Sequence, residues 1–106
     1  MKSGSVYDQM TCSERRVADY LKSLGITWSY EHPVFVWDEQ SRPRVWTPDF
    51  YLNQFGIYIE VCGSHLFDYQ YRRRIYQKNG HLVIFLHLYK HSERWIYHFS
   101  DYLHFF

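Results

Sequence analysis

Thr47-Pro48-Asp49-Phe50-Tyr51-Leu52 and, after a gap of four residues, Ile57-Tyr58-Ile59-Glu60-Val61-Cys62-Gly63 form the stretch of sequence that decides the fold. Both halves have the composition of β-strands, and the turn-forming residues 53–56 between them predict a hairpin. With that loop, Leu52 pairs with Ile57, and Asp49 comes directly opposite Glu60. Directly opposed residues have Cβ atoms roughly 5 Å apart, so the two carboxylates repel each other unless a cation compensates them.

The period of two along a strand gives this hairpin an apolar and a polar face. The apolar face, which we expect to pack on the core, carries Phe50, Leu52, Ile57, Ile59 and Val61. The other face carries Asp49, Tyr51, Tyr58, Glu60 and Cys62. Carboxylate oxygens are hard ligands that suit Mg²⁺ or Mn²⁺. The alternative is a hairpin with a solvated acidic side, but acids are poor strand formers and facing acids are worse, which favours the metal site.

Length and composition predict one globular domain. A chain of 106 residues can bury one core but not two, and we expect a flexible leader at 1–10 and a single domain at 11–106. No apolar run approaches the ~20 residues of a membrane helix. Residues 1–5 lack the apolar stretch of a signal peptide, and two cysteines are too few for a disulfide framework. These features predict an intracellular, cytoplasmic protein.

The N-terminal part of the domain has a clear helix signal. Thr11-x-x-Glu14 is a capping box, and it predicts a helix that runs to about Leu24 and ends at Gly25. The apolar stripe of this helix consists of Val17, Tyr20, Leu21 and Leu24. Glu14 lies at the head of the stripe, where it can serve as a capping side chain, as a functional acid, or as both.

The other elements follow from hydrophobic periodicity and from turn residues. We expect strands at 26–30, 34–37 and 45–52, a polar turn at 38–44, a helix at 68–79 and a strand at 82–88. The last strand is nearly all apolar, as expected of a central strand buried on both faces. The tail predicts a helix capped by Ser92, although 95–99 could also form a strand.

The connection from Cys62 to Leu82 is long enough for a crossover, so the strands at its two ends are predicted to be parallel. The predicted order is α-β-β-β-α-β with a C-terminal helix. The expected fold class is therefore α/β, with a mixed sheet flanked by helices.

Four segments together carry a family resemblance: Ser13-Glu14, Tyr30-Glu31-x-Pro33, Arg44-x-x-Thr47-Pro48-Asp49-Phe50 and Ile59-Glu60-Val61-x-Gly63. In this order, over residues 11–89, the chain resembles the PD-(D/E)XK nuclease superfamily. It looks most like the small members akin to transposon-encoded and very-short-patch-type endonucleases. The resemblance implies a restriction-endonuclease-like core and Mg²⁺-dependent hydrolysis of phosphodiester bonds, with DNA rather than RNA as the expected substrate.

The resemblance also implies roles for individual residues. Asp49 and Glu60 would be the metal ligands, together with the main-chain carbonyl of Val61. Glu14 would support the site directly or through a metal-bound water. The metal, Mg²⁺ or Mn²⁺, would lower the pKa of a bound water and stabilise the charge that develops on the scissile phosphate.

This sequence departs from the family motif at Cys62, where the motif has lysine. A thiol carries no positive charge and is a weak donor, so another basic residue must take over the role. The second predicted helix offers Arg72, Arg73, Arg74 and Lys78, and we expect Arg72 or Arg73 to be the substitute. The alternative for these residues is a solvated helix face.

Nucleic-acid contacts must come from local basic clusters, because the net charge of the chain is only +1. The residues expected to contact phosphates are Arg15, Arg16, Arg72, Arg73, Arg74 and Lys78. A small nuclease covers little of its substrate, so a homodimer, or a place in a larger assembly, is expected. The aromatic tail at 95–106 is the candidate dimer surface.

Three other interpretations remain open at this point. The first is a catalytically inactive relative that serves as a nucleic-acid-binding or assembly module, which the missing lysine favours and the retained acids oppose. The second is a zinc module built from Cys62-x-x-His65 and His87-x-x-x-His91. The third is a thiol-nucleophile enzyme that uses Cys62.

Overall fold

The computed structural model describes residues 5–64, 68–89 and 93–103. Its helical elements are the 3₁₀ turn η1 (Val6–Gln9), α1 (Cys12–Ser23), α2 (Tyr69–Lys78) and α3 (Arg94–Leu103). Its strands are β1 (Trp28–Tyr30), β2 (Val34–Trp37), β3 (Pro43–Trp46), β4 (Phe50–Leu52), β5 (Ile57–Cys62) and β6 (Val83–His87).

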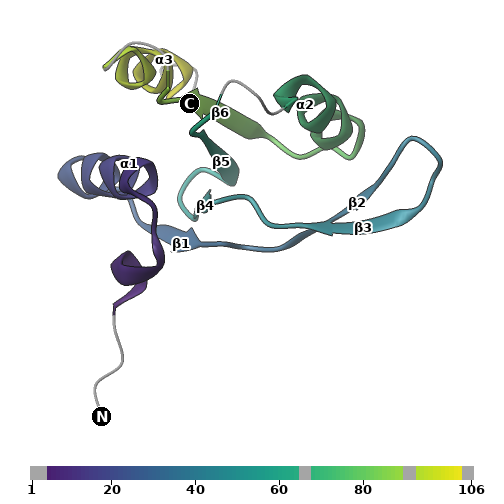
Figure 1. Ribbon diagram of the computed structural model, residues 1–106, viewed down its shortest axis with the longest axis horizontal. Coiled ribbons are helices and arrows are strands. Elements are labelled where there is room, and N and C mark those ends of the chain that lie inside the picture. Colours follow the sequence, from purple (N-terminus) through teal and green to yellow (C-terminus); the bar gives the residue numbers. More distant parts are fainter. Residues whose placement is uncertain (1–4, 65–67, 90–92, 104–106) are drawn as a thin grey trace.

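The main sheet has four strands in the order β1-β4-β5-β6, and β2 pairs with β3 in a separate two-stranded ribbon (Figure 1). β1, β4 and β5 are antiparallel neighbours, whereas β5 and β6 are parallel, as the crossover length predicted. The α/β class and the mixed sheet flanked by helices are confirmed. The expectation of a central 82–88 strand is wrong, because β6 lies at the end of the sheet order.

The two faces of the sheet are covered by different helices. One core joins α1 and α3 to a sheet face, with Val17, Leu21, Phe50, Ile59 and Leu86 among its buried side chains. A second core joins α2 and the ribbon to the opposite face, and it includes Val36, Cys62, Ile75, Tyr76 and Phe85. β6 is therefore buried on both faces although it ends the sheet, which explains its continuous apolar sequence.

The capping box of α1 forms as predicted. The Thr11 hydroxyl accepts a hydrogen bond from the Glu14 N–H (3.1 Å), and the Glu14 carboxylate accepts one from the Thr11 N–H (3.0 Å). Gly25 has a φ of 71° just beyond the helix, a conformation that glycine adopts without strain. The predicted stripe is correct for Val17 and Leu21 but wrong for Leu24, which is 48% exposed.

The flexible leader expected at 1–10 is an ordered part of the fold from Val6 onward. η1 precedes α1, and Met10 is buried in the same core as the inner face of α1. The ring of Tyr7 meets that of Trp28 edge to face, with 5.8 Å between centroids. Burial of the Met10 and Tyr7 side chains against the core therefore orders a segment that its composition alone predicted to be a flexible leader.

The central hairpin has the predicted register, with Leu52 opposite Ile57 and Phe50 opposite Ile59. However, the continuous strand expected at 45–52 is broken. β3 ends at Trp46 and β4 begins at Phe50, with Thr47-Pro48-Asp49 between them. Proline has no N–H to donate to a strand ladder, so the ladder stops here. The chain before this break instead forms the ribbon.

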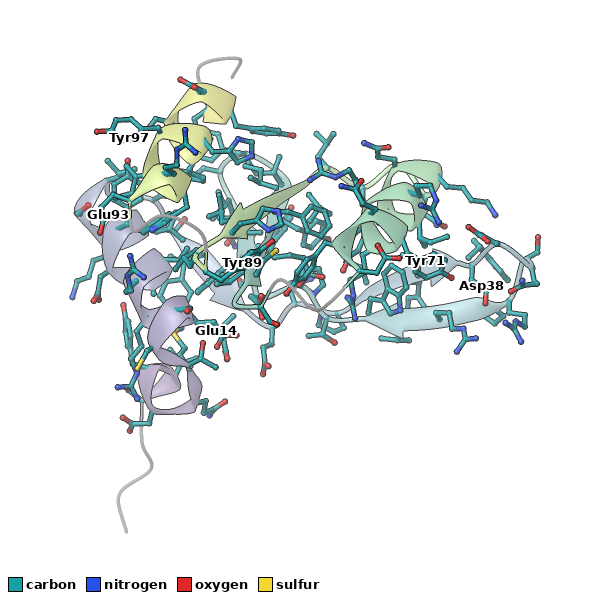
Figure 2. All side chains as sticks on the ribbon, turned by 45° about the horizontal axis from the view of Figure 1, so that its top comes forward. Glu14, Asp38, Tyr71, Tyr89, Glu93 and Tyr97 are labelled. Carbon is teal, nitrogen blue, oxygen red and sulfur yellow. The ribbon has the colours of Figure 1, made fainter. Side chains whose placement is uncertain are left out.

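Asp38 closes the far end of the ribbon (Figure 2). Its carboxylate accepts hydrogen bonds from the N–H groups of Gln40 and Arg42, and from the guanidinium groups of Arg42 and Arg44. The Arg42 N–H and these other donors hold the pKa of Asp38 well below its usual range. The predicted turn at 38–44 is thus shorter, because Pro43 and Arg44 already belong to β3.

α3 confirms that the tail is helical rather than a strand, while its expected cap at Ser92 lies outside the described residues. Trp95 and Phe99 are buried in the chain's own core, so they are not available to the dimer surface expected at 95–106. Of this helix, Tyr97 remains 71% exposed (Figure 2). Among the described residues, no helix is both long and apolar enough to cross a membrane.

Candidate functional site

A cleft of about 270 Å³ lies just before the start of β4, where β5 continues with β6 as its only strand partner among the described residues. Its lining comes from the break before β4, from β5 and from the first turn of α2, and consists of Thr47, Asp49, Glu60, Val61, Tyr69 and Arg72. The broken strand opens this cleft, because β4 begins only at Phe50 and so leaves one edge of β5 without a strand neighbour beyond Ile59. Asp49 and Glu60, which the hairpin register predicted to be neighbours, both reach it.

Asp49 takes the place of a strand neighbour at this open edge. Its Oδ2 accepts a hydrogen bond from the Val61 N–H at 2.7 Å, and its own carbonyl accepts one from the Glu31 N–H at 2.8 Å. The N–H and C=O of one strand residue point to the same side. The Val61 carbonyl therefore faces the same edge as Asp49, so that a backbone oxygen and a carboxylate lie on one side of the cleft.

The environment of Asp49 opposes a negative charge. Burial, together with the nearby Glu60 and Glu14, raises the pKa of this carboxyl to about 8, although the Val61 N–H acts in the opposite direction. A carboxyl in this position needs either a proton or a cation at neutral pH.

Glu60, the second acid of the cleft, is buried on β5, with 8% of its surface exposed. Its Oε2 accepts hydrogen bonds from the Tyr76 hydroxyl at 2.9 Å and from Arg72 Nη1 at 3.0 Å. Burial raises the pKa of Glu60, and Arg72 and Tyr76 oppose that rise. Both hydrogen bonds from described residues go to Oε2, which leaves Oε1 for a cation in the cleft.

Glu14 lies in the first turn of α1 (Figure 2) and adds to the negative charge around Asp49. Besides capping the helix, its Oε1 accepts a hydrogen bond from the Tyr30 hydroxyl at 2.7 Å. Its carboxyl also lies close enough to Asp49 to raise the pKa of that group. The capping role of Glu14 is confirmed, and the same side chain adjoins the acid pair, so a functional role stays a prediction.

The three consecutive arginines of α2 point to three different places. Arg72 lines the cleft, where it pairs with Glu60 and lies over the ring of Trp46, 4.7 Å from its centroid. Arg73 lies over the ring of Phe85 and does not line the cleft. Arg74 pairs with Glu39 of the ribbon at 3.5 Å. Of the two candidates for the missing lysine, only Arg72 is in position.

The other predicted phosphate contacts lie away from the cleft. Arg15 donates to the Tyr7 carbonyl, and Arg16 pairs with Glu93 at 3.4 Å on the surface formed by α1 and α3. Lys78 donates to the Asp38 carbonyl at 2.9 Å and so ties α2 to the ribbon. The structure therefore does not gather the six basic residues into one surface.

Cys62 is buried beneath α2, and burial raises the pKa of its thiol to about 12. A buried, protonated thiol is a poor nucleophile, which argues against the thiol-enzyme interpretation. Cys62 and His87 are partners in the parallel β5–β6 pair. The other two residues of the zinc interpretation, His65 and His91, lie outside the described residues.

Sequence reasoning missed the tyrosines that support the acids. Tyr30 holds Glu14, Tyr76 holds Glu60, and Tyr69 lines the cleft. For α2 a signal existed, because Tyr69, Arg72 and Tyr76 recur at i, i+3 and i+7 and so share one helix face. The sequence singled out Tyr30 only as part of the resembling segments, without a role, because its contact with Glu14 depends on β1 lying near the start of α1.

The donor set suits Mg²⁺ or Mn²⁺ better than a closed metal cage. Among the described residues, no three His, Cys, Asp or Glu side chains are gathered closely enough to hold a metal ion by themselves. Mg²⁺ does not require that, since it commonly uses one or two carboxylates and keeps several waters for substrate phosphates to replace. Asp49, Glu60 and the Val61 carbonyl fit such a cation.

Comparison with known proteins adds no further constraint: this chain matches no protein-family model, no curated protein and no solved structure.

Proposed function

We propose that this protein is a metal-dependent endonuclease that hydrolyses phosphodiester bonds in DNA at the cleft formed by Asp49, Glu60, Val61 and Arg72. The observation that carries the proposal is the surroundings of the Asp49 carboxyl group. This group is buried beside two other acids with the Val61 N–H as its one hydrogen-bond donor among the described residues. A divalent cation would remove this electrostatic conflict.

Each residue of the cleft has a role in this proposal. Asp49, Glu60 and the Val61 carbonyl would hold Mg²⁺ or Mn²⁺, which supplies electrostatic stabilisation of the scissile phosphate and makes the attacking water more acidic. Arg72 would neutralise charge on the phosphate, the task that the motif lysine performs in the family the sequence resembles. Its stacking on Trp46 and its bond to Glu60 fix the guanidinium in advance, which favours catalysis.

At the level of the fold, the proposal assigns this protein a restriction-endonuclease-like core. Two features support it: the acid-bearing antiparallel pair β4–β5 and the parallel β6 reached through α2. A helix that precedes the sheet and brings an acid to the site is the third feature. Function does not follow from fold, so the proposal depends on the cleft.

Cleavage of linear, supercoiled and branched DNA, each with Mg²⁺, with Mn²⁺ and with EDTA, tests the proposal. We expect metal-dependent cutting that Asp49→Asn and Glu60→Gln each reduce by at least about 100-fold. Asp19→Asn is the matched control, because Asp19 is an exposed acid on α1. Absence of both cutting and calorimetric metal binding in the unaltered protein would overturn the proposal.

A second candidate is a catalytically inactive module of the same fold that binds nucleic acid or assembles with a partner. The bonds that Arg72 and Tyr76 make to Glu60 favour it, because they partly compensate this buried acid without any metal. The same measurement separates the candidates. DNA binding without metal binding supports the module, and metal binding supports the nuclease.

A further inference from the structure

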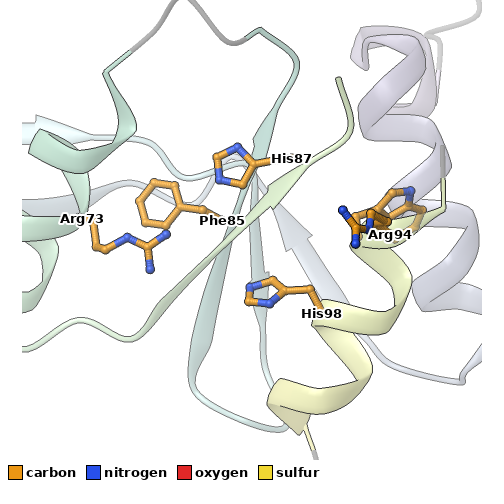
Figure 3. Close-up of a pocket in the computed structure, with 6 residues that line it drawn as sticks. Arg73, Phe85, His87, Arg94 and His98 are labelled. Carbon is orange, nitrogen blue, oxygen red and sulfur yellow. The ribbon is translucent and has the colours of Figure 1, made fainter. Parts of the chain in front are cut away.

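A second pocket, separate from the acidic cleft, lies between α2, β6 and α3 (Figure 3). Its volume is about 240 Å³, and its lining consists of Arg73, Phe85, His87, Arg94, Trp95 and His98. Four of these six side chains are arginine or histidine, and none is acidic. The pocket shares no lining residue with the cleft that contains Asp49 and Glu60.

The basic groups converge on this pocket from three elements. Arg73 extends from α2 and His98 from α3, so that the two side chains point toward one another across β6 (Figure 3). His87 comes from β6 itself, where its Nδ1 bonds the Tyr89 hydroxyl at 3.0 Å. The two arginines carry like charges that repel each other, and no acid lines the pocket, so a bound anion would relieve that repulsion.

No described residue accepts a hydrogen bond from the guanidinium of either arginine of the pocket. Among the described residues, neither Arg73 nor Arg94 forms an ion pair with a carboxylate. The neighbouring Glu93 pairs with Arg16 instead. Arg73 lies over the Phe85 ring at 4.9 Å, which supports the plane of the guanidinium while its N–H edges stay open.

The size and chemistry of the pocket suit a phosphate group. Arginine pairs with phosphate oxygens through two parallel hydrogen bonds, and imidazole adds further donors. The pocket also adjoins the start of α3, where backbone N–H groups favour an anion. Its volume lies below the ~300–1,000 Å³ of sites for drug-sized ligands, which fits a phosphate with a small part of its carrier.

We propose that the pocket formed by Arg73, His87, Arg94 and His98 is a binding site for a phosphate group. The proposal does not depend on nuclease activity, because no residue of the pocket belongs to the acidic cleft. The phosphate can be a terminal phosphomonoester or an internal phosphate of a nucleic-acid strand, and the chemistry of recognition is the same for both.

The test is a titration of the full chain with inorganic phosphate in EDTA, followed by calorimetry and by NMR of the histidine ring protons. We expect saturable binding of one phosphate per chain, with shifts at His87 and His98. Arg94→Gln should weaken it about tenfold through the loss of a charge-assisted hydrogen bond, and His98→Gln should weaken it less. Arg74→Gln is the matched control, since Arg74 is an exposed arginine of α2 that faces the ribbon.

Two results would overturn the proposal: no saturable binding up to tens of millimolar phosphate, or equal weakening by Arg94→Gln and Arg74→Gln. Arg94 is exposed, so its replacement leaves the fold intact, and thermal unfolding of each variant checks this. A short oligonucleotide with and without a 5′-phosphate then identifies the carrier. Tighter Arg94-dependent binding of the phosphorylated form indicates a terminal phosphate, and equal Arg94-dependent binding indicates an internal one. Oligonucleotide binding that does not depend on Arg94 contradicts the site.

Discussion

Arg72 Nη1 lies 3.0 Å from Oε2 of Glu60, and this contact brings a positive charge from α2 to a strand that has no lysine or arginine of its own. The Arg72 side chain is only 27% exposed, and its guanidinium lies over the Trp46 ring. In the proposed nuclease, α2 therefore supplies the basic group that β5 lacks. The same contact partly compensates the cost of burying the Glu60 carboxylate.

Replacement of Arg72 tests whether it performs the task of the missing lysine. We expect Arg72→Gln to lower the rate of DNA cleavage about 100-fold, the usual loss when one donor to developing charge is removed. Arg72→Lys should retain part of the activity, because it keeps the charge but loses the planar contact with Trp46. Single-turnover cleavage rates give the comparison. Arg74→Gln is the control, and an equal loss in that variant would contradict the assignment.

Asp49→Asn should make the protein more stable while it abolishes metal binding. The amide keeps an oxygen for the Val61 N–H but carries no charge beside Glu60 and Glu14. We expect the free energy of unfolding at pH 8 to rise by about 1–3 kcal/mol in EDTA. Chemical denaturation and Mn²⁺ calorimetry measure the two effects. Asp19→Asn should change neither, and a less stable Asp49→Asn variant would count against the electrostatic conflict described above.

Stability without metal should depend on pH in the direction opposite to that of ordinary acids. The folded protein holds the Asp49 proton up to a pKa of about 8, whereas an unfolded chain releases it near pH 4. Between these values the folded state binds more protons, so its stability falls as the pH rises from about 4 to about 8. Urea denaturation in EDTA at several pH values measures this slope.

Saturating Mg²⁺ should reverse that loss at the upper end of the range, because the cation replaces the proton and its binding releases protons. In Asp49→Asn the slope should become smaller, and what remains comes from Glu60, whose pKa is also raised by burial. The idea fails if the variant and the unaltered protein show the same pH dependence. Asp38 contributes with the opposite sign in a separate range, since its lowered pKa means that its stabilising hydrogen bonds are lost only as the pH falls below about 4.

Tyr76→Phe tests whether the helix supports Glu60 by hydrogen bonding. The hydroxyl is one of two donors to Oε2, and Tyr76 is almost fully buried. Its loss leaves a buried carboxylate with Arg72 alone, so the free energy of unfolding should fall by about 1–2 kcal/mol at neutral pH. Tyr97→Phe makes the same chemical change at an exposed position and should have little effect. Thermal unfolding of both variants decides the matter, and equal effects would reject the supporting role.

Local sequence signals predicted the parts of this fold that depend on residues close together in the chain. The Thr11–Glu14 cap, the 53–56 loop and the register of Leu52 with Ile57 all depend on contacts within a few residues. The adjacency of Asp49 and Glu60 followed from that register, but the face that carries them is not solvated, because Glu60 and Cys62 are buried beneath α2. Turn chemistry, capping and the alternation of strand side chains are strong over such distances.

The surroundings of the acid pair depend on contacts between distant segments. The sequence alone determined that two carboxylates would face each other, and that basic residues would lie on a following helix. Only the tertiary structure decided that Arg72 meets Glu60, that Arg73 turns to Phe85, and that β6 ends the sheet. The side chains of adjacent helix residues differ by about 100° in direction. The way in which α2 docks on the sheet therefore selects which of the three arginines enters the cleft, and their order in the sequence does not.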